Sequence, residues 1–189
     1  MLIPLRLSAQ SDEQLMKRAS QGNERAFEEL YNRHARRLQG FFTRRLGNDA
    51  DLAADFMHDT FLRLYAARER YQGNRDFRAW LYTIAYNLLK NHLRKPTPLS
   101  SPSEGTLDSL ADNEDIEIDI DADILHDALH NVLKSLPEHL ALLFSLHYEE
   151  ELTVPQIAQI TQLPEGTVKS RLHKTMNIIK KELKKYENR

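Results

Sequence analysis

An acidic, proline-containing segment in the middle of the chain limits the possible folds more than any other feature. Pro96 and Pro98 end the helical pattern before them, because proline lacks the backbone amide and disfavours helical geometry in the preceding residue. The stretch PTPLSSPSEGTLDS is rich in Pro, Ser and Thr, and the following ADNEDIEIDIDAD is strongly acidic. Such segments bury too little apolar surface to fold alone. We therefore expect two domains, residues 1–95 and 124–189, joined by a flexible acidic linker over residues 96–123.

Charge is segregated along the chain in the same way. Residues 1–95 carry 17 Lys and Arg against 11 Asp and Glu, whereas residues 96–127 carry 10 acidic residues and no basic one. Residues 128–189 are again basic, with 9 Lys and Arg against 7 Glu. The formal net charge of −2 thus conceals two basic blocks on either side of an acidic one. Basic blocks favour a polyanionic partner such as nucleic acid, although an ordinary solvated surface also produces them.

The N-terminal block has the apolar period of four amphipathic helices. Ser11 and Gln14 form a capping box that begins the first helix, and Gly22 ends it. A second helix runs over residues 23–46, a third starts at residue 48 or 49, and a fourth is capped by Asp76. Four such helices with short connections predict a compact bundle. The apolar stripe of the fourth helix consists of Phe77, Trp80, Leu81, Ile84, Ala85, Leu88 and Leu89.

The C-terminal block is also helical in its pattern. We expect helices over residues 124–136 and 138–150, separated by Pro137. Thr153 caps a short helix, LPEG makes a tight turn, and a basic helix follows over residues 167–186. A short helix, a turn of about four residues containing glycine and a second helix is the helix-turn-helix pattern. The predicted fold is therefore all-α, with a four-helix bundle and a helix-turn-helix domain.

The second helix of this motif is the first candidate site. In a helix-turn-helix the second helix lies in the major groove of DNA, where an Arg such as Arg171 can bond guanine bidentately. Val168 and Leu172 belong to a buried stripe, which leaves the polar side chains for DNA. A helical hairpin with a merely basic face is the alternative interpretation. The candidates for contact with duplex DNA are Thr167, Lys169, Ser170, Arg171, His173 and Lys174.

The outer face of the fourth helix is the second candidate site. Tyr82 and Tyr86 lie among basic side chains at a spacing of four, away from the Trp80 stripe. Exposed tyrosines can stack on unpaired bases, which contributes about 1–3 kcal/mol per base. The alternative is a solvated face whose tyrosines pack on neighbouring side chains. The candidates for contact with melted DNA are Asn74, Arg75, Arg78, Tyr82, Tyr86, Asn87 and Lys90.

The outer face of the third helix is the third candidate site. Leu52 and Leu62 lie beside Asp55 and Asp59, away from the core stripe of this helix. Leucines beside acids suit a basic helical partner, although isolated exposed leucines are common on protein surfaces. The face is therefore a candidate protein-binding surface.

These stretches, in this order, resemble the extracytoplasmic-function sigma factors. Residues 49–95 are similar to the second conserved region of that family, and residues 133–174 are similar to the fourth. The chain departs from the family pattern at His58, where Gln is usual, and at Pro155, where an acid often precedes the Ile-Ala pair. The matching positions are Phe77, Trp80, Leu81, Ile84, Ala85 and Asn87 in the second region, and Leu136, Pro137, Ile157, Ala158 and residues 166–172 in the fourth.

The resemblance implies an alternative sigma factor that binds core RNA polymerase and selects promoters. Residues 1–95 would dock on the clamp helices of the largest subunit and open the minus-ten element. Residues 124–189 would read the minus-thirty-five element and meet the polymerase flap, while the acidic linker runs through the polymerase. An anti-sigma factor would hold the free protein inactive. The polymerase-binding residues implied are Leu52, Asp55, His58, Asp59 and Leu62.

Other functional classes find little support in the sequence. The chain has no cysteine, which excludes disulfides and thiol catalysis, and its apolar runs fall short of the roughly 20 residues of a membrane span. His126 and His130 superficially resemble a zinc-protease pair, and Asp55, His58 and Asp59 a cation site, but neither set supplies a complete ligand pattern. We therefore expect a cytoplasmic, non-enzymatic protein without membrane insertion, metal, cofactor or small-molecule substrate.

A two-domain transcription regulator that binds only duplex DNA is the stronger alternative. Its C-terminal half would have much the same sequence pattern. The N-terminal half discriminates between the two, because a sigma factor needs a polymerase-binding face and a strand-opening face. A regulator instead needs a ligand pocket or a dimer surface.

Limited proteolysis tests the predicted division of the chain. We expect the first cuts between Pro96 and Asp123, because proteases prefer accessible segments with few stabilising contacts. Mass spectrometry of the earliest fragments locates the cut sites. Early cleavage inside either predicted domain would contradict the boundaries.

Overall fold

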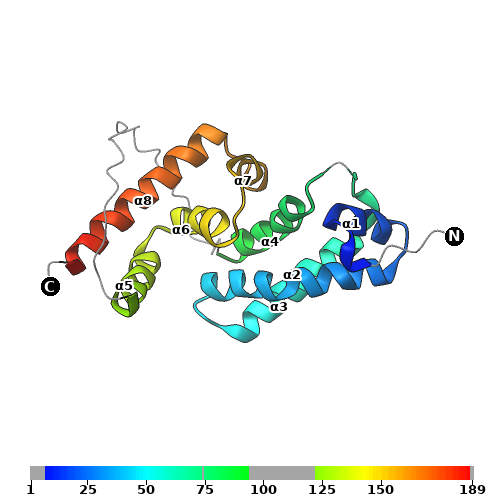
Figure 1. Ribbon diagram of the computed structural model, residues 1–189, viewed down its shortest axis with the longest axis horizontal. Helices are drawn as coiled ribbons and strands as arrows, with labels where there is room; N and C mark the ends of the chain where they lie inside the picture. The colour runs from blue at the N-terminus through cyan, green and yellow to red at the C-terminus, as the bar shows by residue number, and fades with distance from the viewer. Residues whose placement is uncertain (1–6, 74, 94–121, 188–189) are drawn as a thin grey trace.

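The computed structural model describes residues 7–73, 75–93 and 122–187, and every regular element within these ranges is a helix. The all-α prediction is thereby confirmed. The N-terminal helices lie together at one end of the molecule and the C-terminal helices at the other, and the two groups meet in the middle (Figure 1). Almost all of the predicted linker, residues 96–123, lies outside the described residues, as does Asn74.

The N-terminal group contains the four predicted helices. Two short 3₁₀ turns, η1 (Leu7–Ala9) and η2 (Arg68–Arg70), accompany them. The helices are α1 (Asp12–Ser20), α2 (Glu24–Arg45), α3 (Ala50–Ala66) and α4 (Phe77–Leu93).

Short polar side chains set the start of each of these helices. Ser11 and Gln14 form the predicted capping box, with hydrogen bonds of 3.3 and 3.1 Å to each other's backbone amides. Asn23, Asp49 and Asp76 each accept a hydrogen bond from the amide three residues further on, at 3.1, 2.9 and 2.7 Å. Such caps satisfy amides that have no partner inside the helix. The helix starts are therefore encoded locally.

The core of the bundle follows the predicted apolar stripe of α4, although Trp80 and Ile84 of that stripe are half-buried. Phe77, Leu81 and Leu89 on α4 are completely buried, together with Phe41 of α2. Tyr82, which we expected on an exposed face of α4, is only 2% exposed. That expectation is wrong because the C-terminal helices pack over this face of α4.

The C-terminal group consists of four helices and one wide turn. The predicted helix over residues 138–150 ends early, and a π-helical turn, η3 (Ser145–Glu149), replaces its second half. Pro137 precedes this helix, and Thr153 with Gln156 forms the capping box of the next one. The helix-turn-helix prediction is confirmed. The first helix of the whole C-terminal group begins at Ala122, two residues before the expected Ile124. The helices are α5 (Ala122–Ser135), α6 (Glu138–Phe144), α7 (Val154–Thr161) and α8 (Glu165–Glu187).

Two clusters of buried side chains hold the helices together. The smaller one joins α5, α6 and α8 through residues such as Val132, Phe144 and Ile179. The larger one is continuous from the N-terminal bundle into the helix-turn-helix, because α7 packs against α4. Its C-terminal members are Leu142, Leu143, Leu146, Leu152, Ile157, Ile160, Val168 and Leu172.

A polar cluster ties α1 to α2. The carboxylate of Asp12 accepts hydrogen bonds from Arg33 Nη1 at 2.8 Å and from His34 Nε2 at 2.7 Å. Arg33 also donates to Glu29 and to three backbone carbonyls before α1. Burial by itself would raise the pKa of Asp12, but His34 and Arg33 outweigh it and hold this pKa below the usual 3.8. The ionised carboxylate is therefore part of the folded structure.

We expect Asp12→Asn to lower the free energy of unfolding by about 1–3 kcal/mol at neutral pH, the size of a hydrogen bond to a charged group. A carboxylate whose pKa is lower in the folded state stabilises the fold above its unfolded pKa, and this contribution is lost as the pH falls through the folded value. Urea unfolding at about pH 7 and at about pH 3.5 checks this, and the difference between variant and wild type should shrink at the lower pH. An equal difference at both pH values would contradict it.

Candidate nucleic-acid and protein-binding surfaces

The first three turns of α8 present the predicted basic face. Val168 and Leu172 are buried against the rest of the domain, while Lys169, Ser170 and Lys174 are exposed. The remaining three candidates, Thr167, Arg171 and His173, are half-buried. Ser170 donates to the carbonyl oxygen of Thr167 at 3.1 Å, and His173 bonds Asn177 at 3.0 Å. The helix thus keeps its polar side chains on the side away from the core.

One side chain of this basic face, Arg171, lies near the N-terminal bundle. Burial raises the pKa of Tyr86 on α4, and the charge of Arg171 on α8 opposes that rise. Burial lowers the pKa of His139, and the charges of Arg171 and Lys174 lower it further. Side chains predicted to bind two different promoter elements are therefore neighbours in this structure.

The outer face of α4 is only partly open. Arg75, Asn87 and Lys90 are exposed, and the ammonium of Lys90 lies 5.9 Å from the centre of the Tyr86 ring. Arg78 and Tyr86 are half-buried. The structure therefore leaves part of the predicted single-strand face available and covers the rest.

Glu150 of the C-terminal domain occupies the covered part. The Tyr82 hydroxyl donates a hydrogen bond to the Glu150 carboxylate, and Arg78 donates to the Glu150 carbonyl oxygen. Burial raises the pKa of Tyr82, and the charge and hydrogen bond of Glu150 raise it further. The Tyr82 ring packs edge-on against Phe41 at 5.6 Å. Tyr82 thus has the environment of a core side chain.

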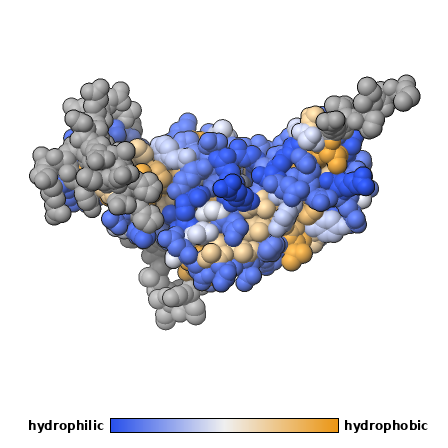
Figure 2. Space-filling view, turned by 60° about the horizontal axis from the view of Figure 1, so that its bottom comes forward, coloured by the Kyte–Doolittle hydropathy of each residue, from blue (hydrophilic) through white to orange (hydrophobic). Residues whose placement is uncertain are grey.

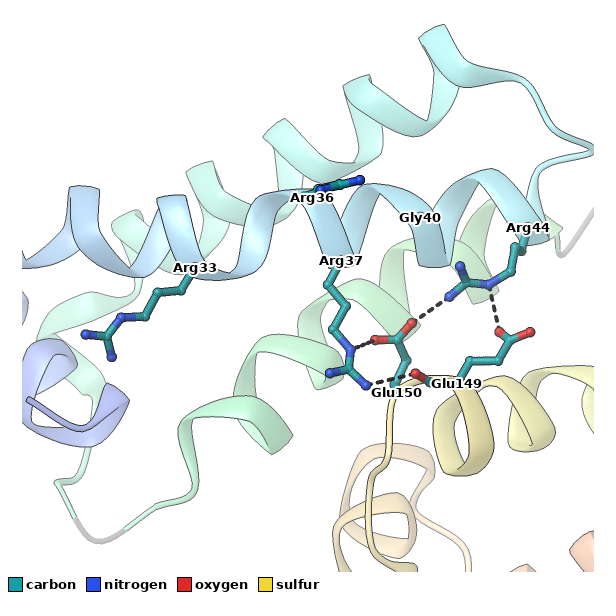
Figure 3. A pocket seen from close by; sticks show the side chains of 7 residues that line it. All are labelled: Arg33, Arg36, Arg37, Gly40, Arg44, Glu149 and Glu150. Carbon is teal, nitrogen blue, oxygen red and sulfur yellow. Dashed lines mark hydrogen bonds and ion pairs between the residues drawn. The ribbon is translucent and has the colours of Figure 1, made fainter. Parts of the chain in front are cut away.

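An arginine cleft on α2 receives the same carboxylate. Figure 3 shows Arg37 and Arg44 on either side of Glu150, in a cleft of about 470 Å³ that Arg33, Arg36, Gly40 and Glu149 also line. Arg37 Nε lies 3.0 Å and Arg44 Nη2 2.7 Å from the Glu150 carboxylate, and Arg44 Nε lies 2.8 Å from Glu149. Sequence reasoning missed this cleft. The available signal was the spacing of Arg33, Arg37 and Arg44, which places them on one face of a helix.

The predicted protein-binding face of α3 borders an apolar groove. Leu62 is 69% exposed, Asp55 and His58 are exposed, and Leu52 and Asp59 are half-buried. The groove has a volume of about 620 Å³ and lies between α2 and α3. Figure 2 shows apolar surface gathered on the N-terminal half of the molecule. The groove is lined by Glu24, Phe27, Glu28, Tyr31, His58, Phe61, Leu62 and Tyr65.

Sequence reasoning missed the contribution of α2 to this groove. Phe27 and Tyr31 lie on one face of α2 at a spacing of four, and both are half-buried and form one wall. The Tyr31 hydroxyl lies 3.1 Å from His58 Nε2, which holds the His58 ring beside the groove. The groove is largely apolar, and Glu24 and Glu28 also line it. Such a surface suits an amphipathic helix with basic side chains.

Two further expectations concern absent features. The described residues contain no group of three or more His, Cys, Asp and Glu side chains placed to hold a metal ion. The side chains of His126 and His130 lie outside the part of the chain that can be described. No helix within the described ranges is long and apolar enough to cross a membrane.

Comparisons with known proteins agree with this geometry. Residues 30–97 match the family model "Sigma-70 region 2", and residues 126–177 match "Sigma-70, region 4". The chain is 32% identical over 186 residues to an RNA polymerase sigma-H factor of Pseudomonas aeruginosa, covering 94% of this chain and 96% of the relative. It is 31% identical over 187 residues to an ECF RNA polymerase sigma-E factor of Haemophilus influenzae, covering 92% and 95%.

A solved structure shares the fold. It contains the sigma factor RpoE in complex with the anti-sigma factor NepR from Bartonella quintana. The TM-score is 0.61 at 21% identity, and the match covers 84% of this chain and 96% of that one. At this identity the likeness concerns the fold alone.

Proposed function

This chain belongs to the extracytoplasmic-function (ECF) family of RNA polymerase sigma factors, and on that premise we propose how its two domains divide the work of initiation. It is an alternative sigma factor, which binds core RNA polymerase and promoter DNA and directs promoter-specific transcription. The family consists of initiation factors and is not a known enzyme family. We further propose that the chain has no catalytic activity, cofactor or metal of its own and acts in the cytoplasm.

The proposed division assigns one promoter element to each domain. Residues 1–95 bind the clamp helices of the largest polymerase subunit and open the minus-ten element. Residues 124–189 read the minus-thirty-five element and contact the flap, and residues 96–123 pass through the polymerase. Support comes from the apolar groove on the N-terminal bundle and the basic face of α8 on the C-terminal domain.

The groove between α2 and α3 is the observation that carries this proposal over the alternative. A regulator that binds only duplex DNA would use such a groove for a small ligand or a second copy of itself, neither of which calls for the acidic side chains of Glu24 and Glu28 beside it. A sigma factor needs such a surface, because it must bind a helical element of the polymerase. We propose that His58 and Leu62 bind the polymerase in the groove, together with its walls Phe27 and Tyr31, and that Leu52, Asp55 and Asp59 bind it on the adjoining face of α3.

We also propose that an anti-sigma factor restrains the free protein. The related RpoE was solved with such a partner, and the fold of that chain is shared. An anti-sigma factor that covered the groove would compete directly with the polymerase. The two partners would then exclude each other.

We expect Leu62→Arg to weaken binding to core polymerase at least about tenfold, because a buried leucine anchor would become a charge inside an apolar interface. The side chain is 69% exposed in the free protein, so the fold should be retained. Asn131→Arg is the matched control, since it adds the same charge on an exposed position of α5. Fluorescence titration with core polymerase measures both affinities. Equal affinity of a folded Leu62→Arg protein would refute the assignment of the groove.

Promoter opening should separate the roles of Arg171 and Tyr86. Arg171→Ala removes the guanidinium group that we propose to enter the major groove of DNA. Initial binding to the promoter should therefore weaken by about 1–3 kcal/mol, and base preference within the upstream element should relax. Tyr86→Ala should leave initial binding nearly intact and slow strand opening, because a ring stacks best on a base that has left the helix. Lys181→Ala, on an exposed position of α8 beyond the motif, is the control.

Opening kinetics on duplex and pre-melted templates distinguish these effects. A pre-melted bubble should restore part of the Tyr86→Ala loss, because the cost of melting is removed. The bubble should not restore the initial promoter binding that Arg171→Ala loses. The opposite pattern of rescue would show that the proposed division of labour is incorrect.

A further inference from the structure

We propose that Glu150 is an intramolecular lock, which closes the two domains of the free protein on each other and covers the single-strand face of α4. The inference that this closure masks DNA contacts rests on the proposed function of α4. The closure itself depends only on contacts between described residues. The arginine cleft of α2 is thus the binding site inside the same chain, and the carboxylate at its centre is that of Glu150.

The burial of Glu150 sets it apart from all other charged side chains in the described part of the molecule. Its exposed fraction is 0%, and the other fully buried polar residues there are uncharged. A buried carboxylate is tolerated only when charged or strong hydrogen-bond donors replace the lost water. Glu150 therefore needs its partners in a way that a surface glutamate does not.

Every described donor to this carboxylate comes from the other domain. Arg37 and Arg44 donate from α2, and Tyr82 donates from α4. Hydrogen bonds between guanidinium groups and carboxylates are among the strongest in proteins. The carboxylate can therefore stay dry only while the domains are closed, and it must return to water when they separate.

The local backbone is shaped to deliver Glu150. The π-helical turn of residues 145–149 ends directly before it, and Glu151 directly after it has a φ of 54°. A residue with a side chain adopts this left-handed geometry at an energetic cost, and π turns are frequent at functional sites. A regular helix through residue 150, as the sequence pattern predicted, would not make this bend.

Further polar contacts support the closure around Glu150. Arg37 Nη2 donates to the carbonyl oxygen of Glu149 at 2.8 Å, and Arg44 pairs with the carboxylate of the same residue. At the other side of the interface Gln156 Nε2 donates to Asp76 at 2.7 Å. The lock is thus one buried charge at the centre of a larger set of contacts.

The closure uses groups that the open protein would offer to DNA. The hydroxyl of Tyr82 and a guanidinium nitrogen of Arg78 are bonded to Glu150, and Arg171 lies near Tyr86. Opening frees Tyr82, Arg37, Arg44 and Arg78 from Glu150, and these side chains then lie on one side of the bundle. Arginines beside an aromatic ring suit a single-stranded phosphodiester with unstacked bases. The same cleft is therefore occupied either by Glu150 or by nucleic acid.

Distance measurement on the free protein tests the lock. The chain contains no native cysteine, so spin labels on Asn32→Cys and Lys181→Cys, both exposed, report the separation of α2 and α8 without background. Double electron–electron resonance should give one narrow distance distribution for the otherwise wild-type protein. Glu150→Gln removes the charge but keeps the shape, and should shift most of the population to longer and broader distances.

A control variant and a double variant complete the distance measurement. Glu151→Gln is the matched control: Glu151 also pairs with Arg37, at 3.2 Å, but its side chain is 71% exposed, and an ion pair open to water contributes little, so this variant should keep the narrow distribution. Arg37→Gln with Arg44→Gln breaks the lock from the bundle side, where both side chains reach solvent, and should open the protein as Glu150→Gln does. Narrow, unchanged distances in both lock variants would overturn the proposal.

Binding of a fluorescent single-stranded oligonucleotide separates the lock from its function. Glu150→Gln should bind it several-fold more tightly than Glu151→Gln, because Tyr82 and Arg78 become available. If resonance shows opening but the affinity stays equal, the lock stands and the proposed role of α4 in strand opening fails.

Discussion

One buried carboxylate lies at the centre of the contact between the two halves of this molecule, beside the apolar packing of α7 on α4. Glu150 is surrounded by the guanidinium groups of Arg37 and Arg44 and the hydroxyl of Tyr82, and none of these belongs to its own domain. A charge without water is stable only in such surroundings, so the position of the helix-turn-helix on the bundle follows from it. Tyr82 is buried between this carboxylate and the ring of Phe41 in its own bundle.

The closed arrangement brings the two proposed DNA-binding surfaces, on α4 and α8, next to each other. A face of α4 that is suited to unpaired bases also packs against α7, and the basic start of α8 lies close to Tyr86. A sigma factor must offer both domains to a promoter at sites that are far apart on the DNA. Closure therefore opposes promoter recognition until a partner with higher affinity separates the domains.

The groove between α2 and α3 does not depend on Glu150. It is built within the N-terminal bundle, from Phe27 and Tyr31 on one helix and Phe61 and Leu62 on the other, and Glu150 does not contribute to it. The proposed polymerase-binding surface is thus available in the closed protein, while part of the proposed DNA-binding surface is not. This order suits a factor that first meets the polymerase and then the promoter.

The sequence by itself determined the features that arise from neighbouring residues. Ser11 and Asp76 cap helices through hydrogen bonds three residues away, and the stripes at helical spacing identify the cores of both domains and the basic face of α8. Only the tertiary structure decided the burial of Tyr82, the π turn before Glu150 and the arginine cleft. The burial of Tyr82 and the occupation of the arginine cleft join residues 68 and 113 positions apart, and no local period encodes which distant side chains a buried carboxylate will meet.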